Sequence, residues 1–309
     1  MRIVFFGCDD FAAINLEHLI DEGHRVVGVV TQPDRPHGRG MRMAYAPTKQ
    51  IALAQGIPVF QPDSLKNPVL VDRLRWFHAD LFVVIAYGKF LPQAVLDLPL
   101  KGCINVHASL LPKYRGAAPI NWAILHGEVE TGVSIMQMDA GMDTGAVIAR
   151  VACPIPDDMT SVALRLKLAD MGTRLLVETL VKIAAGTHTV TPQDHDRSSY
   201  APKMHKDLGH IRWDRPAKEI HDLVRGLQPW PGAFTFWRTN RLKVLDASAA
   251  AALVQGKPGE IVELHKDGFY VQAADRAVLV RRVHPASSHA MDARSFLAGH
   301  KLAIGEILG

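Results

Sequence analysis

The sequence predicts an α/β protein in which a doubly wound parallel sheet is followed by a small β-barrel domain. The length of 309 residues suggests two domains rather than one. Unbroken apolar runs alternate with helix-like periodicity in the first two thirds, and short strand-like segments fill the last third. With 48% hydrophobic and 21% charged residues, the composition is that of a globular protein and not of a disordered chain or a coiled coil.

The first domain is expected over residues 1–188. Apolar runs typical of buried strands lie at 2–7, 26–30, 57–60, 80–88, 103–107, 132–138 and 146–153. Helices are expected at 11–23, 47–56, 65–77 and 161–186, the last of which ends at Gly186. This alternation predicts a Rossmann-like sheet with helices on both faces.

The polar stretch at 189–206 contains two prolines and no apolar periodicity, as expected of a linker. Beyond it, over residues 207–309, brief apolar segments such as AFTFW, RLKVL and GFYVQ are separated by turn residues. These segments predict a small OB-like β-barrel.

The three cysteines, Cys8, Cys103 and Cys153, include no C-x-x-C pair and indicate neither a disulfide framework nor a zinc cluster. No apolar run approaches the roughly 20 residues of a membrane span, and the first residues do not have the pattern of a signal peptide. We therefore expect a cytoplasmic protein.

Positive charge is in excess only in the C-terminal part. Residues 204–309 hold 15 of the 35 Lys and Arg residues but 11 of the 31 Asp and Glu residues, so the net charge of +4 lies there. This distribution suggests that the front binds a small molecule and that the back contacts a polyanion such as nucleic acid. An ordinary solvated surface is the alternative interpretation.

Common cofactor motifs are absent from the sequence. The first strand-to-helix turn, Gly7 to Asp10, contains one glycine and does not match G-x-G-x-x-G, and no G-x-x-x-x-G-K-[ST] or H-E-x-x-H motif occurs. Nicotinamide and ATP chemistry therefore lose support, and the sequence offers no such metal-ligand spacing.

Two strand ends carry residues suited to acyl transfer. The run CINVH places Asn105 and His107 on the same side of a strand, since side chains alternate with a period of two. An amide can donate to a developing oxyanion, and an imidazole can donate or move a proton near neutral pH. Asp143, in the glycine-bracketed loop DAGMDTG, is free to approach His107. The alternatives are a polar strand end for the pair and ordinary turn chemistry for Asp143.

The blocks CINVHASLLPKYRGAAPINWAI and ETGVSIMQMDAGMDTG together resemble the folate-dependent formyltransferases. The resemblance extends to MRIVFFGCDDFA at the start, VVTQPDRPHGRG at 29–40, GIPVFQPDSL at 56–65 and VVIAYGKFLP at 83–92. The segments YAPKMHK, IRWDRPAKEIHDLVRGLQPWPGAF and FLAGHKLAIGEILG are similar to the linker and barrel of members that act on charged tRNA. The resemblance covers essentially the whole chain.

The resemblance implies transfer of the formyl group of 10-formyltetrahydrofolate to the α-amino group of methionine on initiator tRNA, with no metal. It makes Asn105, His107 and Asp143 the catalytic residues. Asn105 and His107 would stabilise the oxyanion, and Asp143 would favour the imidazolium and help to pass a proton to the departing folate nitrogen.

Binding residues are also implied by the resemblance. Folate is expected, mostly through backbone groups, at Tyr87, Gly88, Phe90, Leu91, Pro92, Asp139 and Gly141. The substrate pocket is expected to include Ser109, Leu110, Leu111 and Pro112. Binding of tRNA is expected at Arg35, Arg39, Arg42, Lys203 and Lys206. The positive charge of the C-terminal part, and not the resemblance, adds Arg225, Arg281 and Arg282 of the barrel. Loop 32–46, which carries Arg39, is expected to be a lid that orders on tRNA, and the protein is expected to be a monomer.

The sequence departs from the family pattern at three places. Cys8 and Asp9 replace a Thr-Pro pair and are expected to loosen the first turn, Met41 replaces a lysine, and Ala108 replaces a glycine. A sugar-nucleotide N-formyltransferase is the strongest alternative enzyme. A glycinamide ribonucleotide formyltransferase and a catalytically silent RNA-binding relative are weaker ones, since the first turn lacks a glycine-rich phosphate cradle and the catalytic residues are intact.

Overall fold

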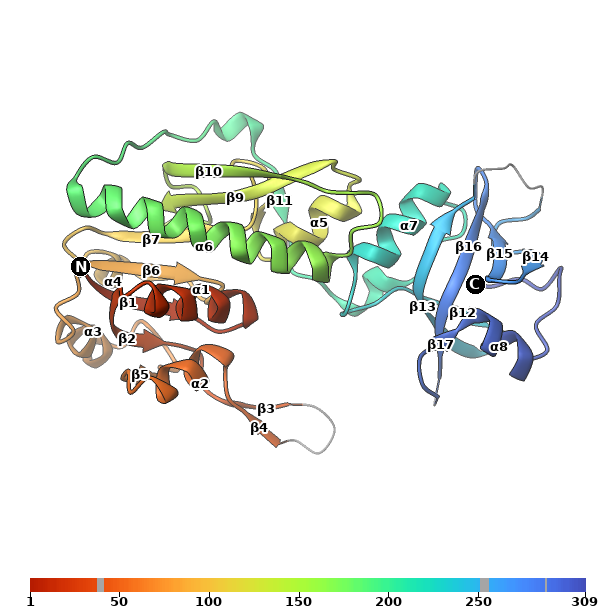
Figure 1. Cartoon of the computed structure of the whole chain (residues 1–309), viewed down its shortest axis with the longest axis horizontal. Helices are drawn as coiled ribbons and strands as arrows, with labels where there is room; N and C mark the ends of the chain where they lie inside the picture. Colours follow the sequence, from red (N-terminus) through yellow and green to blue (C-terminus); the bar gives the residue numbers. More distant parts are fainter. Residues whose placement is uncertain (38–41, 251–255, 287) are drawn as a thin grey trace. The chain divides into compact units, whose positions relative to one another are not determined.

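The structure is a computed structural model that describes residues 1–37, 42–250, 256–286 and 288–309 (Figure 1). The chain divides into two compact units, and neither is one continuous stretch of sequence. Unit 1 consists of Met1–Pro119, Glu130–Pro154 and Arg165–Ala201. Unit 2 consists of Ile120–Val129, Ile155–Leu164 and Pro202–Gly309.

Unit 1 is built on a seven-stranded sheet. Its strands are β1 (Arg2–Gly7), β2 (Arg25–Val30), β5 (Val59–Phe60), β6 (Leu81–Ile85), β7 (Cys103–His107), β9 (Glu130–Gln137) and β10 (Val147–Pro154). They lie in the order β10-β9-β7-β6-β1-β2-β5. The five strands from β7 to β5 are parallel, whereas β9 and β10 are antiparallel to their neighbours. This confirms the expected doubly wound core and shows that β9, next to the edge strand β10, runs opposite to the other strands.

Helices cover both faces of this sheet (Figure 1). On one face, α3 (Pro68–Arg75) and α4 (Gln93–Leu96) share an apolar core with alternate residues of β1 and β6. On the other face lie α1 (Asp10–Asp21) and α6 (Ser161–Ala185). A Cβ on Gly172 of α6 would lie 3.3 Å from Val106, so this glycine allows the helix to approach β7 closely. The remaining helices that begin in unit 1 are α2 (Pro47–Ala54) and α5 (Pro119–Leu125).

The turn after β1 is held firmly, in contrast to the loosening expected from Cys8 and Asp9. The Asp9 carboxylate caps α1 by accepting from the Ala12 N–H at 3.0 Å and also pairs with Arg165 of α6. Cys8 Sγ lies 3.4 Å from the Tyr87 carbonyl and 3.3 Å from the Gln32 nitrogen. Burial raises the pKa of the Cys8 thiol, so it stays protonated as a donor.

Unit 1 also contains smaller elements. An antiparallel pair is formed by β3 (Arg35–His37) and β4 (Arg42–Ala44), and a parallel pair by β8 (Arg115–Gly116) and β11 (Tyr200–Ala201). A 3-10 turn, η1, spans His195–Arg197. The base of the β3–β4 hairpin is fixed because Lys49 binds the Asp34 carboxylate and donates to Gln61 Oε1 at 2.8 Å.

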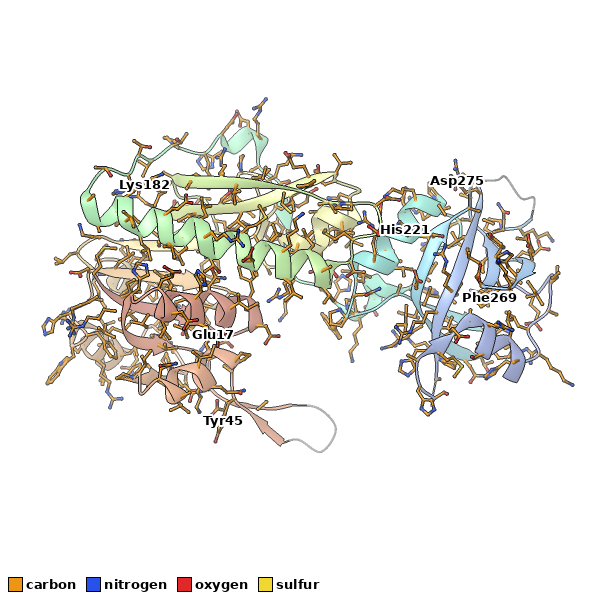
Figure 2. The ribbon with its side chains drawn as sticks, in the orientation of Figure 1. Glu17, Tyr45, Lys182, His221, Phe269 and Asp275 are labelled. Carbon is orange, nitrogen blue, oxygen red and sulfur yellow. The ribbon has the colours of Figure 1, made fainter. Side chains whose placement is uncertain are left out.

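Unit 2 is built on a six-stranded antiparallel sheet. Its strands are β12 (Phe234–Trp237), β13 (Asn240–Ala249), β14 (Ile261–His265), β15 (Gly268–Gln272), β16 (Ala277–Pro285) and β17 (Met291–Asp292). The order is β12-β13-β16-β15-β14, and β17 pairs with β16. The fully buried Phe269 of β15 belongs to the core of this unit, which also includes residues of α7 (Ala217–Gly226) and α8 (Ala293–Gly299) (Figure 2). A second 3-10 turn, η2, spans Lys206–Gly209.

Residues 305–309 connect the two edge strands of this sheet. Ile307 and Leu308 form bridges with Glu260, next to β14, and with Trp237 of β12. Backbone hydrogen bonds from Leu308 to Gly259 and from Gly309 to Phe236 support these bridges. The sheet is thereby closed into the expected small barrel, and neither edge is left open along these bridges.

Arg225 of α7 is buried, which corrects its expected place on a polyanion-binding surface. Its Nε donates to the Asp222 carboxylate at 2.7 Å, and both side chains are about 5% exposed or less. Its Nη1 donates to the Pro156 and Met159 carbonyls at 3.2 and 2.8 Å. Arg225 thus attaches segment 155–164 to α7 within unit 2, and it is not available to an external ligand.

Among the described residues, no helix combines the length and the apolar character that crossing a bilayer requires.

Candidate active site

Asn105, His107 and Asp143 meet in unit 1, as the sequence predicts. Asn105 Nδ2 donates to Asp143 Oδ1 at 3.2 Å, and His107 Nδ1 lies 3.7 Å from Asp143 Oδ2. Asn105 is paired with Val84, whose side chain belongs to the core under α3 and α4, so the Asn105 side chain lies on that face of the sheet. His107, two residues further along β7, lies on the same face. The His107 and Asp143 side chains are 6% and 15% exposed, so their interaction is weakly screened by water.

The environment of His107 defines which ring nitrogen can exchange a proton. Nε2 lies 2.8 Å from the Tyr114 carbonyl, which can only accept, so Nε2 carries a hydrogen and donates it. Nδ1 faces the Asp143 carboxylate. It is therefore the ring atom at which a proton can be taken up and released beside a negative charge.

Backbone conformation directs Asp143 toward these partners. Its φ of 53° lies in the left-handed region, which is unusual for a residue other than glycine. The Gly116 N–H donates to Asp143 Oδ2 at 2.8 Å and fixes the carboxylate from a third direction. A Cβ on Gly145 would lie 1.9 Å from the Gln137 carbonyl, so the loop can approach β9 this closely only with a glycine there.

The segment after β6 combines a buried tyrosine with an exposed phenylalanine. The Tyr87 ring is 1% exposed and packs against Phe6, and its hydroxyl has no hydrogen-bond partner among the described residues. Burial raises the pKa of Tyr87 above its usual range. Phe90 is 64% exposed, Gly88 is exposed, Leu91 is buried, and Pro92 precedes α4. Tyr87 therefore holds the segment in place, whereas the backbone near Gly88 and the Phe90 ring face outward.

The other residues of the expected folate and substrate sites lie in two turns. Asp139 accepts from the Gly141 N–H at 2.9 Å and from the Thr144 hydroxyl at 2.7 Å and shapes the loop that carries Asp143. In the stretch from Ser109 to Pro112, Ser109 and Leu111 are buried, and Leu110 and Pro112 are partly exposed. The Ser109 hydroxyl donates to the Lys113 carbonyl at 2.6 Å, so it stabilises the turn.

The basic residues expected to bind tRNA belong to separate parts of the chain. Arg35 and Arg42 are on β3 and β4, whereas Arg39 lies outside the described residues. Lys203 and Lys206 are exposed residues of unit 2.

Sequence reasoning missed three groups that contact His107, Asp143 or the Asp143 loop. The Tyr114 carbonyl and the Gly116 N–H are backbone groups, and no sequence pattern reports where they point. Gln193 is 6% exposed and contacts the Asp143 loop, although it lies in a polar stretch expected to be a linker. Gln193 is the fifth residue of this polar stretch, 189–206, which has no apolar periodicity to mark a buried position.

The cysteines do not contribute a nucleophile. Cys103 begins β7 and is buried, and this burial raises its pKa to about 12. Cys153 is also buried.

Two family models match the chain. One, described as formyl transferase, matches residues 1–180, and the other, described as formyl transferase, C-terminal domain, matches residues 203–301. The methionyl-tRNA formyltransferase of Acetivibrio thermocellus is 46% identical over 310 residues and is covered completely, as is this chain. That of Moorella thermoacetica is 44% identical over 309 residues, with 100% of this chain and 99% of the relative covered.

Solved structures with a similar fold are more distant in sequence. HypX from Aquifex aeolicus, in complex with tetrahydrofolic acid, has a TM-score of 0.68 at 19% identity, over 99% of this chain and 48% of HypX. An N-formyltransferase from Helicobacter canadensis, in complex with folinic acid and dTDP-3-aminofucose, has a TM-score of 0.68 at 19% identity. It matches over 91% of this chain and 98% of its own. At this identity the likeness supports the fold.

Proposed function

This chain belongs to the formyl transferase family, and we propose that it transfers the formyl group of 10-formyltetrahydrofolate to the α-amino group of methionine on initiator tRNA. The observation that carries the chemistry is the meeting of Asn105, His107 and Asp143 at one end of β7. Relatives 42–46% identical over essentially the full chain are named methionyl-tRNA formyltransferase, which supports the choice of substrate.

The residues near the catalytic group fit a folate in two respects. The exposed Phe90 ring offers an apolar face to a flat heterocycle, and the exposed backbone at Gly88 offers polar groups. We assign folate binding to Tyr87, Gly88, Phe90, Leu91, Pro92, Asp139 and Gly141, with Tyr87 acting through its place in the core. When bound, the folate supplies the formyl carbon on N10.

The residues of this chain then act on charge and protons. As the methionyl amine adds to the formyl carbon, negative charge develops on the formyl oxygen. Asn105 Nδ2 has two hydrogens, of which the contact with Asp143 uses one, so the other can donate to this oxygen. The attacking nitrogen loses a proton and the departing N10 gains one when its bond to carbon breaks. His107 Nδ1, beside Asp143, is placed to carry that proton.

We assign substrate positioning to Ser109, Leu110, Leu111 and Pro112, and tRNA binding to Arg35, Arg39, Arg42, Lys203 and Lys206. In this proposal unit 1, which includes residues 189–201 of the expected linker, is catalytic, and residues 207–309 add affinity for tRNA. The protein acts as a monomer in the cytoplasm, where charged tRNA is used, and size-exclusion chromatography with light scattering measures the oligomeric state.

The test supplies 10-formyltetrahydrofolate labelled in the formyl group and offers charged initiator tRNA or an amino-sugar nucleotide in parallel. Label is expected on the methionyl-tRNA. Label on the sugar alone would identify a sugar-nucleotide N-formyltransferase and overturn the proposal.

The catalytic assignment is tested with Asn105→Ala, His107→Ala and Asp143→Asn. Each removes a donor, a proton carrier or its charged partner and is expected to lower kcat by about 10²–10⁴-fold. The control is Asp72→Asn, which removes a carboxylate paired with Arg75 on the surface of α3. Turnover near that of the wild type in a correctly folded His107→Ala protein would contradict the assignment.

A further inference from the structure

Gln193 is a buried amide whose hydrogen-bonding groups point at the active-site loop and at Arg115. Its Nε2 donates to the Asp143 carbonyl at 2.8 Å and to the Gly145 carbonyl at 2.7 Å. Its Oε1 accepts from Arg115 Nε at 3.1 Å and from Nη2 at 2.7 Å. Both hydrogens of the amide are used, and its oxygen is oriented by a two-pronged donor.

The two carbonyls that Gln193 binds bracket the turn from Asp143 to Gly145. Asp143 has a left-handed backbone conformation at φ 53°, which a residue with a Cβ does not favour by itself. A single amide nitrogen that binds carbonyls two residues apart holds this turn in one conformation. The conformation in turn directs the Asp143 carboxylate to Asn105, to the Gly116 N–H and to His107.

Arg115 connects the same amide to the other side of the site. It lies between Tyr114, whose carbonyl accepts from His107, and Gly116, whose N–H donates to Asp143. The segment that carries Gln193 also binds this strand directly, because Ser199 Oγ accepts from the Tyr114 N–H and the Ser199 carbonyl accepts from the Arg115 N–H, both at 2.9 Å. Residues 193–199 therefore support Asp143 through the turn that carries it and His107 through the Tyr114 segment.

We propose that Gln193 is a positioning residue of the active site, which acts on the reaction by holding the Asp143 turn in the orientation that His107 and Asn105 require. The inference rests on the proposed function only for the reaction used as a readout. A misplacement of about 1 Å in a catalytic group can lower a rate by about 10²-fold, so the loss of this support has a kinetic effect.

The kinetic test uses Gln193→Ala in the full chain, with methionyl-tRNA and 10-formyltetrahydrofolate. We expect kcat to fall by about 10–100-fold while both KM values stay within about twofold, because the turn is displaced but no binding group is removed. In an Asp143→Asn background the same substitution is expected to change kcat by less than about threefold. Losses that multiply in the double variant, or an unchanged kcat for Gln193→Ala, would overturn the proposal.

Two further variants separate positioning from packing. Gln193→Met keeps the length and volume of the side chain without its donors and is expected to lose as much kcat as Gln193→Ala. Gln272→Ala removes an equally buried glutamine of unit 2, 5% exposed, that donates to the Ala273 carbonyl. It is expected to keep the wild-type kcat. Full activity in Gln193→Met would show that packing alone matters and would overturn the proposal.

A second readout requires no substrate. In the free protein, the ring resonances of His107 in NMR report on the carboxylate beside Nδ1, and they are expected to move in the same direction in Gln193→Met as in Asp143→Asn. Unmoved resonances in Gln193→Met would overturn the positioning role. If the wild type formylated no tRNA, the proposed function would fail, and this comparison would still decide the role of Gln193.

Discussion

A single carboxylate can organise several neighbouring groups, and unit 1 contains two examples. Asp143 contacts the side chains of Asn105 and His107 and one backbone N–H. Asp34 accepts from Lys49 and from Gln61 Nε2, the latter at 2.8 Å, directly before β3. The first arrangement is the one to which we assign proton transfer, and the second fixes the base of the β3–β4 hairpin.

The Asp34 contact makes stability depend on pH. The hydrogen bond from Lys49 holds the pKa of Asp34 below its usual value of 3.8. Its stabilising effect is therefore complete above that value and is lost as the pH falls through the lower, folded-state pKa. We expect the difference in unfolding free energy between wild type and Asp34→Asn to be constant from about pH 5 to 7 and to shrink below it. Urea unfolding at a series of pH values measures this difference.

The matched background for this experiment is Lys49→Met, which removes the ammonium group. There the pH dependence caused by Asp34 is expected to weaken. The same pH dependence in both backgrounds would assign the effect to another group.

At the scale of residues, the sequence predicts side chains better than their supports. The shared face of Asn105 and His107 could be predicted because side chains alternate with a period of two in CINVH. Gln193 could not, because a glutamine in a polar stretch has the same local pattern whether it is exposed or buried. Its role depends on carbonyls 48 and 50 residues away. The effect of Ala108, where the family pattern has glycine, could not be predicted from the sequence either. Its backbone does not have a positive φ, so an alanine fits there without strain.

At the scale of elements, the start of α1 illustrates how one residue can serve two contacts. Asp9 caps the helix and also pairs with Arg165, and the two side chains of this pair are about 40% exposed. A helix cap contributes roughly 0.5–2 kcal/mol, whereas an exposed ion pair contributes about 0–1 kcal/mol. The cap is therefore expected to be the larger contribution.

Two substitutions separate these contributions. Asp9→Ala removes both and is expected to lower the free energy of unfolding by about 1–2 kcal/mol. Asp9→Asn keeps a capping oxygen and is expected to lower it by less than about 1 kcal/mol. Glu17→Ala, at an exposed position on the same helix (Figure 2), is the control and is expected to stay within about 0.5 kcal/mol of wild type in urea unfolding. Equal losses for the two Asp9 variants would mean that the ion pair dominates.

The elements themselves could largely be predicted, but the direction of one strand, β9, could not. The apolar runs at 132–138 and 146–153 correspond to β9 and β10, and β9 runs opposite to both of its neighbours, β7 and β10. A strand covered on both faces has the same hydrophobic pattern in either direction, so the pattern does not reveal its orientation. The short pair of β8 and β11 also had no signal, because two-residue strands depend on tertiary contacts.

At the scale of the whole molecule, the basic residues of the C-terminal part have different roles. Arg225 neutralises the buried Asp222, which Lys218 also binds at 2.8 Å. Arg282 on β16 is exposed. Net charge along the sequence does not distinguish a buried structural arginine from one that a polyanion can reach.

We therefore expect opposite phenotypes from two substitutions. Arg225→Ala leaves Asp222 partly uncompensated and is expected to lower the free energy of unfolding by about 3 kcal/mol, with Lys218 limiting the loss. Arg282→Glu is expected to change stability by less than about 0.5 kcal/mol but to weaken tRNA binding and to reduce its salt dependence. Urea unfolding and filter binding at several salt concentrations measure both.

The outcome that would contradict this division is wild-type stability for Arg225→Ala, or unchanged tRNA affinity for Arg282→Glu. The first would mean that Lys218 alone neutralises Asp222. The second would exclude this face of β16 from the tRNA contact.

The interleaved segments of the two units determine the order in which they can be completed during synthesis. Chains emerge from the ribosome N-terminus first, and every segment of unit 1 has been made once residue 201 is added. The catalytic residues and Gln193 are then all present. Segments 120–129 and 155–164 of unit 2 are synthesised before the residues that they contact. The Trp122 indole can donate to the Pro202 carbonyl, and the Ser161 hydroxyl to the Gln228 carbonyl, only after those later residues have been made. The candidate active site can thus be assembled on the ribosome before the barrel that residues 305–309 close has been synthesised.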